Sequence, residues 1–223
     1  MIHKISILAV IGISWFFLTS CSSNTEILTK DPSVFLDKKI ESPFFGNKNA
    51  KVQMTVFTDF QCPACIQFEK IIGGPLFEEY VNTKKIGLEY RMYPLSIHKN
   101  APEDALASLC AESQWKYKEF AKEMYGLEDQ KKWDPVSTDD RENIAKKIGL
   151  DTGKFQTCMK EWNYVSKIKE DMALGDQLWL QGTPSVYING KKIDFRSREG
   201  LFKIIDAMGQ FETATGAVAP KNQ

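Results

Sequence analysis

The chain has 223 residues with 29 basic and 29 acidic side chains, so its formal net charge is zero. A neutral chain without a basic cluster offers no electrostatic basis for binding nucleic acid. Apolar residues make up 43% of the sequence, which is enough for a packed core, and the length suits one domain or one domain with a sizeable insertion.

The N-terminus is typical of an export signal. Lys4 precedes an apolar run over residues 5–18, which is short for a spanning helix of roughly 20 apolar residues. The run ends in LTSC, which resembles the lipobox of bacterial lipoproteins, where the cysteine is lipidated and begins the mature chain. We therefore expect a signal peptide over residues 1–20 and a lipid anchor at Cys21. The alternative is a secreted protein in which Cys21 only follows the cut site.

The first half of the chain predicts two strands joined by a helix. Residues 21–43 are polar and broken by prolines, which indicates a tether and an N-terminal extension. The β-branched and apolar run over 51–59 predicts a strand buried on both faces. A helix should begin at Pro63 and continue towards Val81, with a kink at Gly73-Gly74-Pro75. Residues 86–92 predict the second strand.

A helical region follows. A first helix is predicted from Pro102 to about Gly126, where apolar residues share one face. A second should cover residues 139–148. A third should begin with Asp151 as its N-cap, and a fourth should lead to Leu180.

The C-terminal part predicts a hairpin and a last helix. Asn189-Gly190 separates strands at 185–188 and 191–195, and this pair tolerates the positive φ angles of a type I′ turn. Ser197 should cap a helix that ends near Met208, before a loose tail over 211–223. Together the elements predict an α/β fold with a mixed sheet. Its parts are a first sheet segment over 44–96, an inserted helical domain over 97–178 and a second sheet segment over 179–210.

Cys62 and Cys65 lie one helical turn apart in the motif CPAC, directly after a strand and at the start of a helix. The free N–H groups and the dipole at a helix N-terminus favour a thiolate, so they should lower the pKa of Cys62. The thiolate is the form that attacks disulfides. Cys65 would face inward as the resolving thiol, and Pro63 would hold the first turn in helical geometry.

Other uses of the two thiols are weaker. A zinc site needs four ligands, usually in two close pairs, but Cys110 and Cys158 are far apart in sequence. A structural clasp across so short a loop would gain little chain entropy. With Cys21 assigned to lipid, the four other cysteines allow three pairings, and only one of them keeps Cys62 with Cys65.

Three segments resemble the DsbA-like thiol–disulfide oxidoreductases: FTDFQCPAC, HKNAPEDALASLCAE and GTPSVYINGKK. The resemblance covers residues of about 44–208. It implies a thioredoxin fold with a helical domain inserted between the second and third strands. It also implies a cis Pro184 that faces the CPAC motif, which leaves the backbone of Thr183 free to pair with an extended substrate.

The resemblance also bears on the remaining cysteines and on partners. Similar pairs in relatives favour a structural disulfide between Cys110 and Cys158, although two buried free thiols are the alternative. The expected partners are reduced or misfolded exported proteins and a quinone-linked membrane protein of the DsbB or VKOR kind. No cofactor and no metal are implied.

The sequence departs from the best-studied oxidase pattern at Ala64, where that pattern has a histidine that stabilises the thiolate. We therefore expect a less depressed Cys62 pKa and a less oxidising couple than in the strongest oxidants. Thr183 also resembles the residue found in isomerase-type relatives. Asp59 is a candidate acceptor for the Cys65 proton or a solvent-facing carboxylate. His98 reads as a loop residue, and Trp179 as core filling or a residue lining the groove.

The predicted function is that of a disulfide donor, tethered by lipid to a bacterial membrane and facing the periplasm or the extracellular side. The alternatives are a disulfide isomerase or reductase, and a non-enzymatic holdase or metal-handling lipoprotein that uses the same groove.

Overall fold

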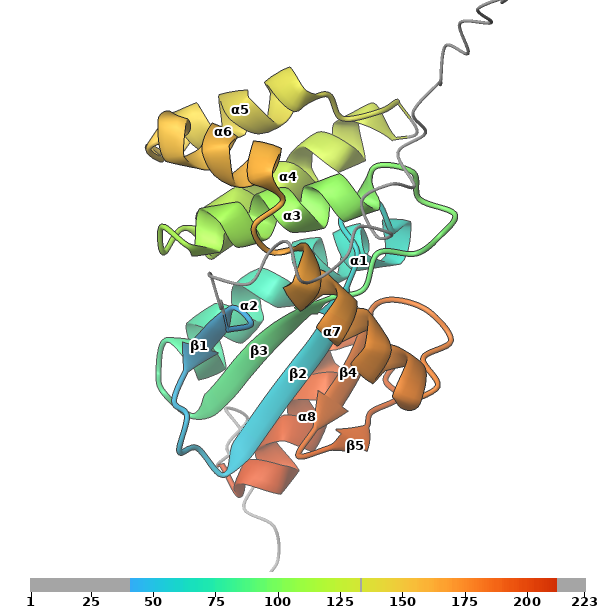
Figure 1. The fold of residues 1–223 in the computed structure, drawn as a ribbon. Coiled ribbons are helices and arrows are strands. Elements are labelled where there is room, and N and C mark those ends of the chain that lie inside the picture. The colour runs from blue at the N-terminus through green and yellow to red at the C-terminus, as the bar shows by residue number, and fades with distance from the viewer. Residues whose placement is uncertain (1–40, 133, 212–223) are drawn as a thin grey trace, which may run out of the picture.

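The computed structural model describes residues 41–132 and 134–211 (Figure 1). The predicted signal peptide, Cys21, most of the tether and the tail after residue 211 lie outside these ranges. Within them, no helix is long and apolar enough to cross a membrane.

A five-stranded mixed sheet forms the centre of the fold, in the order β1-β3-β2-β4-β5. The two predicted N-terminal strands are β2 (Val52–Thr58) and β3 (Ile86–Met92), which pair in parallel. The apolar side chains of β2 are buried on both faces of the sheet, as its run of β-branched and apolar residues predicts. The predicted mixed sheet flanked by helices is confirmed.

One strand was not predicted. β1 (Phe44–Gly46) pairs antiparallel with β3 at one edge of the sheet. It has only three residues, which is too short for an alternation of apolar and polar side chains to be recognised.

The helical segment that begins within CPAC runs from Pro63 to Val81, as predicted, but it contains two π-helical stretches. Its parts are α1 (Pro63–Phe68), η3 (Glu69–Gly73), α2 (Gly74–Leu76) and η4 (Phe77–Val81). The π-helices flank the Gly-Gly-Pro sequence at which a kink was predicted. The missing N–H of Pro75 removes one helical hydrogen bond there.

The inserted helices contain a break that the sequence analysis missed. The predicted helix from Pro102 to Gly126 is wrong, because two helices stand in its place. They are α3 (Ala101–Glu112) and α4 (Tyr117–Lys131). Trp115 lies between them with a left-handed φ of 62°, and the turn allows α4 to fold back onto α3 (Figure 1).

The next three helices follow the prediction closely. α5 (Thr138–Lys147) begins at a capping box formed by Ser137 and Asp140. α6 (Thr152–Glu161) begins at Asp151, whose carboxylate accepts a hydrogen bond from the Lys154 N–H. α7 (Val165–Gln177) ends before Leu180. Helices α3 to α6 stack beyond one end of the sheet, and α7 crosses its front (Figure 1).

The C-terminal hairpin and helix complete the sheet layer. β4 (Ser185–Ile188) pairs with β2, and β5 (Lys191–Lys192) pairs with β4 across a turn in which Asn189 and Gly190 both have positive φ. β5 is shorter than predicted. α8 (Arg198–Gly209) is capped by the Ser197 side chain and lies behind the sheet (Figure 1).

Candidate active site

The CPAC motif lies where β2 turns into α1. Cys62 is the N-cap of α1, with an extended backbone, and Pro63 occupies the first helical position. The Cys62 side chain is 6% exposed, whereas that of Cys65 is fully buried. Both are free thiols in the structure. An external thiol or disulfide can therefore reach Cys62 more easily than Cys65.

The two thiols have opposite acidities. A hydrogen bond from Cys65 is the main cause that lowers the pKa of Cys62 to about 5. Burial opposes this effect, while hydrogen bonds from Thr183 and from the backbone N–H groups of Cys65 and Ala64 reinforce it. Burial raises the pKa of Cys65 well above its ordinary value, and the neighbouring Cys62 raises it further. At neutral pH, Cys62 is therefore favoured as a thiolate, and the buried Cys65 is favoured as a thiol.

The peptide bond between Thr183 and Pro184 is cis, and this segment faces the reactive thiol. The Cys62 Sγ donates to the Thr183 carbonyl oxygen over 3.2 Å. While Cys62 is a thiol that donates to this carbonyl, the buried Thr183 hydroxyl oxygen has no partner among the described residues. Once Cys62 ionises it can no longer donate to the carbonyl, and its thiolate can accept from that hydroxyl instead.

Asp59 supports the loop that leads into Cys62. Its Oδ1 accepts from the Gln61 N–H over 2.8 Å, and its Oδ2 accepts from the Leu95 N–H over 2.8 Å. The Nδ1 of His98 lies 2.7 Å from the same Oδ2. Burial raises the pKa of Asp59, and these hydrogen bonds oppose that rise. The carboxylate is therefore buried rather than solvent-facing, and three groups already hold it.

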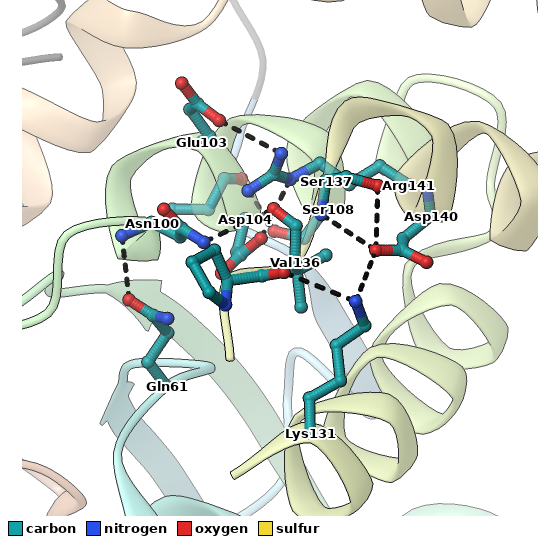
Figure 2. Close-up of polar contacts among 12 residues, drawn as sticks. Gln61, Asn100, Glu103, Asp104, Ser108, Lys131, Val136, Ser137, Asp140 and Arg141 are labelled. Carbon is teal, nitrogen blue, oxygen red and sulfur yellow. Dashed lines mark hydrogen bonds and ion pairs between the residues drawn. The ribbon is translucent and has the colours of Figure 1, made fainter. Parts of the chain in front are cut away.

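The inserted helices hold the active-site loop from the other side (Figure 2). The Asn100 N–H donates to the Gln61 side-chain oxygen over 2.8 Å. Behind Asn100, Asp104 accepts a hydrogen bond from the buried Arg141 over 2.8 Å. The roles of Gln61 and Asn100 at the site were not predicted, because a contact between residues 39 positions apart leaves no periodic pattern in the sequence.

A disulfide joins Cys110 of α3 to Cys158 of α6, with an S–S distance of 1.98 Å. These are the two residues for which the family resemblance favours a disulfide. The bond lies in the inserted helical region, and among residues 41–132 and 134–211 it leaves Cys62 and Cys65 as the free thiols.

A groove of about 510 Å³ runs beside the active site, between α1 and the segment that follows β5. Ala64 and Pro184 both line it. Trp179 does not line this groove. The prediction that it fills the core is also wrong, because Trp179 is 81% exposed. It precedes the cis-proline segment with a left-handed φ of 54°.

The described residues offer no group of three or more His, Cys, Asp or Glu side chains that could hold a metal ion. The chemistry within reach is thiol–disulfide exchange at Cys62, with Cys65 as the second sulfur.

Residues 38–207 match the family model described as Thioredoxin. Among curated proteins, the probable disulfide bond formation protein D of Bacillus anthracis is 28% identical over 151 residues, which cover 65% of this chain and 68% of the relative. The disulfide bond formation protein D of Bacillus subtilis is 23% identical over 159 residues, covering 68% of this chain and 69% of the relative.

Solved structures show the same fold. The oxidised BdbD of Bacillus subtilis superposes with a TM-score of 0.69 at 19% identity, covering 76% of this chain and 93% of that one. A thioredoxin-like oxidoreductase from Silicibacter pomeroyi superposes with a TM-score of 0.61 at 25% identity, covering 81% and 98%. The DsbA of Chlamydia trachomatis superposes with a TM-score of 0.68 at 16% identity, covering 79% and 95%.

Proposed function

We propose that this chain, which belongs to the thioredoxin family as a DsbA-like thiol–disulfide oxidoreductase, donates disulfides to exported proteins through Cys62 and Cys65. The observation that carries the direction is the Cys62 pKa of about 5. A thiolate that is stable at neutral pH stabilises the reduced enzyme, and a stabilised reduced form makes the disulfide form a stronger oxidant.

The donor reaction begins with the Cys62–Cys65 disulfide. A substrate thiolate attacks the Cys62 sulfur, because Cys62 is the more accessible of the two. Cys65 leaves and takes up a proton, as its raised pKa requires. A second substrate thiolate then attacks the substrate sulfur of the mixed disulfide. Cys62 leaves as a thiolate, the substrate gains its disulfide, and the enzyme retains two electrons as a dithiol.

The substrate segment would lie against the cis-proline segment. Pro184 has no N–H, and the backbone of Thr183 offers polar groups to an extended chain, as in the addition of a strand. The groove lined by Ala64 and Pro184 would take the residues that flank the substrate cysteine.

Reoxidation and location complete the proposal. A quinone-linked membrane protein of the DsbB or VKOR kind would accept the two electrons and restore the disulfide. Lipidation at Cys21 would hold the enzyme at the membrane, on the periplasmic or extracellular side. The LTSC motif after an apolar run supports this placement.

The reduction potential of the Cys62–Cys65 couple tests the direction of electron flow. The protein is equilibrated with glutathione buffers, and the free thiols are counted after alkylation. A potential well above that of thioredoxin, about −270 mV, is expected for a disulfide donor. A value near it would make the protein a reductase or isomerase.

Replacement of the reactive thiol tests the enzymatic role itself. Cys62→Ser should abolish the oxidation of a reduced, unfolded substrate protein, because the remaining Cys65 is buried. Full activity of this variant would favour the non-enzymatic holdase. A bound metal in place of a reversible thiol couple would favour the metal-handling lipoprotein.

A further inference from the structure

A second pocket lies away from the thiols, between the π-helices η3 and η4 and the helix α4. Its volume is about 510 Å³, and neither the CPAC motif nor the cis-proline segment lines it. Four aromatic side chains contribute to its wall: Phe77, Tyr90, Tyr117 and Tyr125. π-Helical turns are rare and occur often at functional sites. Because two of them border this pocket, it is a candidate functional site.

A carboxyl group reaches the pocket from η3. Glu69 lines it, and its Oε1 accepts a hydrogen bond from the Tyr90 hydroxyl over 3.0 Å. Its Oε2 lies against Gly73, where a Cβ atom would come within 2.2 Å of it. No cation within the described residues pairs with Glu69. One phenol therefore holds the carboxyl, which lines the pocket without a cationic partner among the described residues.

A second polar group is buried at the same pocket. The Tyr117 side chain is 2% exposed, and its hydroxyl has no hydrogen-bond partner among the described residues. A buried polar group without a partner costs free energy. Tyr117 and Glu69 are thus two polar groups that a ligand could satisfy beside the aromatic rings of the pocket.

Apart from Glu69, the charged residues at the pocket are three lysines and two carboxylates. Lys70 pairs with Asp129 over 2.8 Å. The ammonium group of Lys118 lies 3.9 Å from the centre of the Phe77 ring. The other charged lining residues are Lys122 and Glu78. One aromatic ring of this pocket therefore already attracts a cation, and the lysines and carboxylates of the lining are equal in number.

We propose that this pocket binds a small organic ammonium ion, with Glu69 as its counterion and the aromatic wall around its methyl or methylene groups. Aromatic rings attract ammonium groups through their negative faces. A carboxylate beside such rings supplies the opposite charge. The inference does not involve the thiols, so it stands or falls independently of the oxidoreductase reaction.

Acidity at Glu69 provides a specific signature. Burial raises its pKa to about 7, which the hydrogen bond from Tyr90 partly opposes. An ammonium ion pairs with the ionised form, so its binding should release a proton near neutrality and should strengthen as the pH rises. Between pH 6 and pH 8 the ionised fraction rises about tenfold, and the affinity should rise with it. The other titratable groups at the pocket are Lys70, Glu78, Tyr90, Tyr117, Lys118, Lys122, Tyr125 and Asp129.

Calorimetry on the purified full chain tests the site with choline and with 3,3-dimethyl-1-butanol, which has the same shape without the charge. Choline should bind about tenfold more tightly than the alcohol. Equal affinity for the two probes would mean that the pocket recognises shape alone and would overturn the proposal. Absence of choline binding at pH 8 would also overturn it.

Two variants locate the binding site. Glu69→Gln keeps the acceptor for Tyr90 but removes the charge, so it should weaken choline binding about tenfold and abolish its pH dependence. Lys118→Met frees the Phe77 ring and should strengthen the binding. Unchanged affinity in Glu69→Gln would place choline elsewhere and refute the site. The reduction potential of both variants should equal that of the parent, which controls for folding.

The source of the ammonium group can be resolved in the same assay. Vesicles of phosphatidylcholine present the group at a bilayer, and vesicles of phosphatidylglycerol lack it. Glu69-dependent binding to free choline and to phosphatidylcholine vesicles, but not to phosphatidylglycerol vesicles, assigns the site to lipid headgroups. Glu69-dependent binding to free choline, with neither vesicle bound, assigns it to a soluble ligand.

Discussion

Thr183→Val is expected to make the enzyme a weaker oxidant. Valine keeps the shape of threonine but has no hydroxyl. The hydroxyl that it replaces is buried without a partner while Cys62 is a thiol, and its hydrogen bond to Cys62 lowers the pKa of that residue. The variant therefore removes one donor from the thiolate and leaves the backbone N–H groups of α1 in place.

The size of the effect follows from the strength of the lost hydrogen bond. A hydrogen bond to a charged group contributes about 1.5–3 kcal/mol, which corresponds to roughly one to two pKa units. The Cys62 pKa should rise from about 5 by that amount. At neutral pH most of this change destabilises the reduced form, so the reduction potential should fall by about 30–60 mV.

Two measurements check this expectation. The ultraviolet absorbance of the thiolate, followed during a pH titration of the reduced protein, gives the pKa of Cys62. Equilibration with glutathione gives the potential. Thr183→Ser, which keeps the hydroxyl, is the matched control and should resemble the parent. An unchanged pKa in Thr183→Val, or an equal shift in Thr183→Ser, would show that the hydroxyl does not act on the thiolate.

Two further predictions concern stability. Replacing Cys110 and Cys158 together by alanine should lower the free energy of unfolding by about 4 kcal/mol, because the bond closes a loop with a sequence separation of 48; urea denaturation measures this, and a loss no larger than that of Cys62→Ala would contradict it. Burial, reinforced by Asp104, raises the pKa of Glu128 to about 9 from an ordinary 4.5. Folding thus favours its protonated form, and the resulting stabilisation is complete below the ordinary value and lost as the pH rises through about 9. Between about pH 5 and pH 9, the free energy of unfolding of Glu128→Gln should therefore fall less than that of the parent. Equal falls in the two proteins would contradict the raised Glu128 pKa.

Local sequence signals predicted much of the sheet. β2 was recognisable because its β-branched and apolar run is bounded by polar residues, and β3 covers the residues over which a second strand was predicted. The hairpin between β4 and β5 was recognisable because Asn189-Gly190 tolerates positive φ. Each of these signals lies within a few residues of the structure that it specifies.

Features that depend on tertiary contact were not predictable in the same way. The break between α3 and α4 places Trp115 in a left-handed conformation, although neither glycine nor proline marks the position. The Asp59–His98 contact joins residues 39 positions apart. The Asp59 carboxylate accepts hydrogen bonds from the backbone N–H groups of Gln61 and Leu95, and its role as acceptor of the Cys65 proton stays a prediction.

The two edges of the sheet bear on the handling of unfolded chains. An exposed strand edge is a template for pairing with any extended polypeptide, and the unfolded exported proteins that we propose as substrates would be such polypeptides. Here one edge strand, β1, has three residues, and the other, β5, consists of two lysines. Short edges and lysine side chains both discourage unplanned strand pairing. The edges of the sheet are thus poorly suited to pair with an unfolded substrate, which agrees with our proposal that an extended chain pairs with the cis-proline segment.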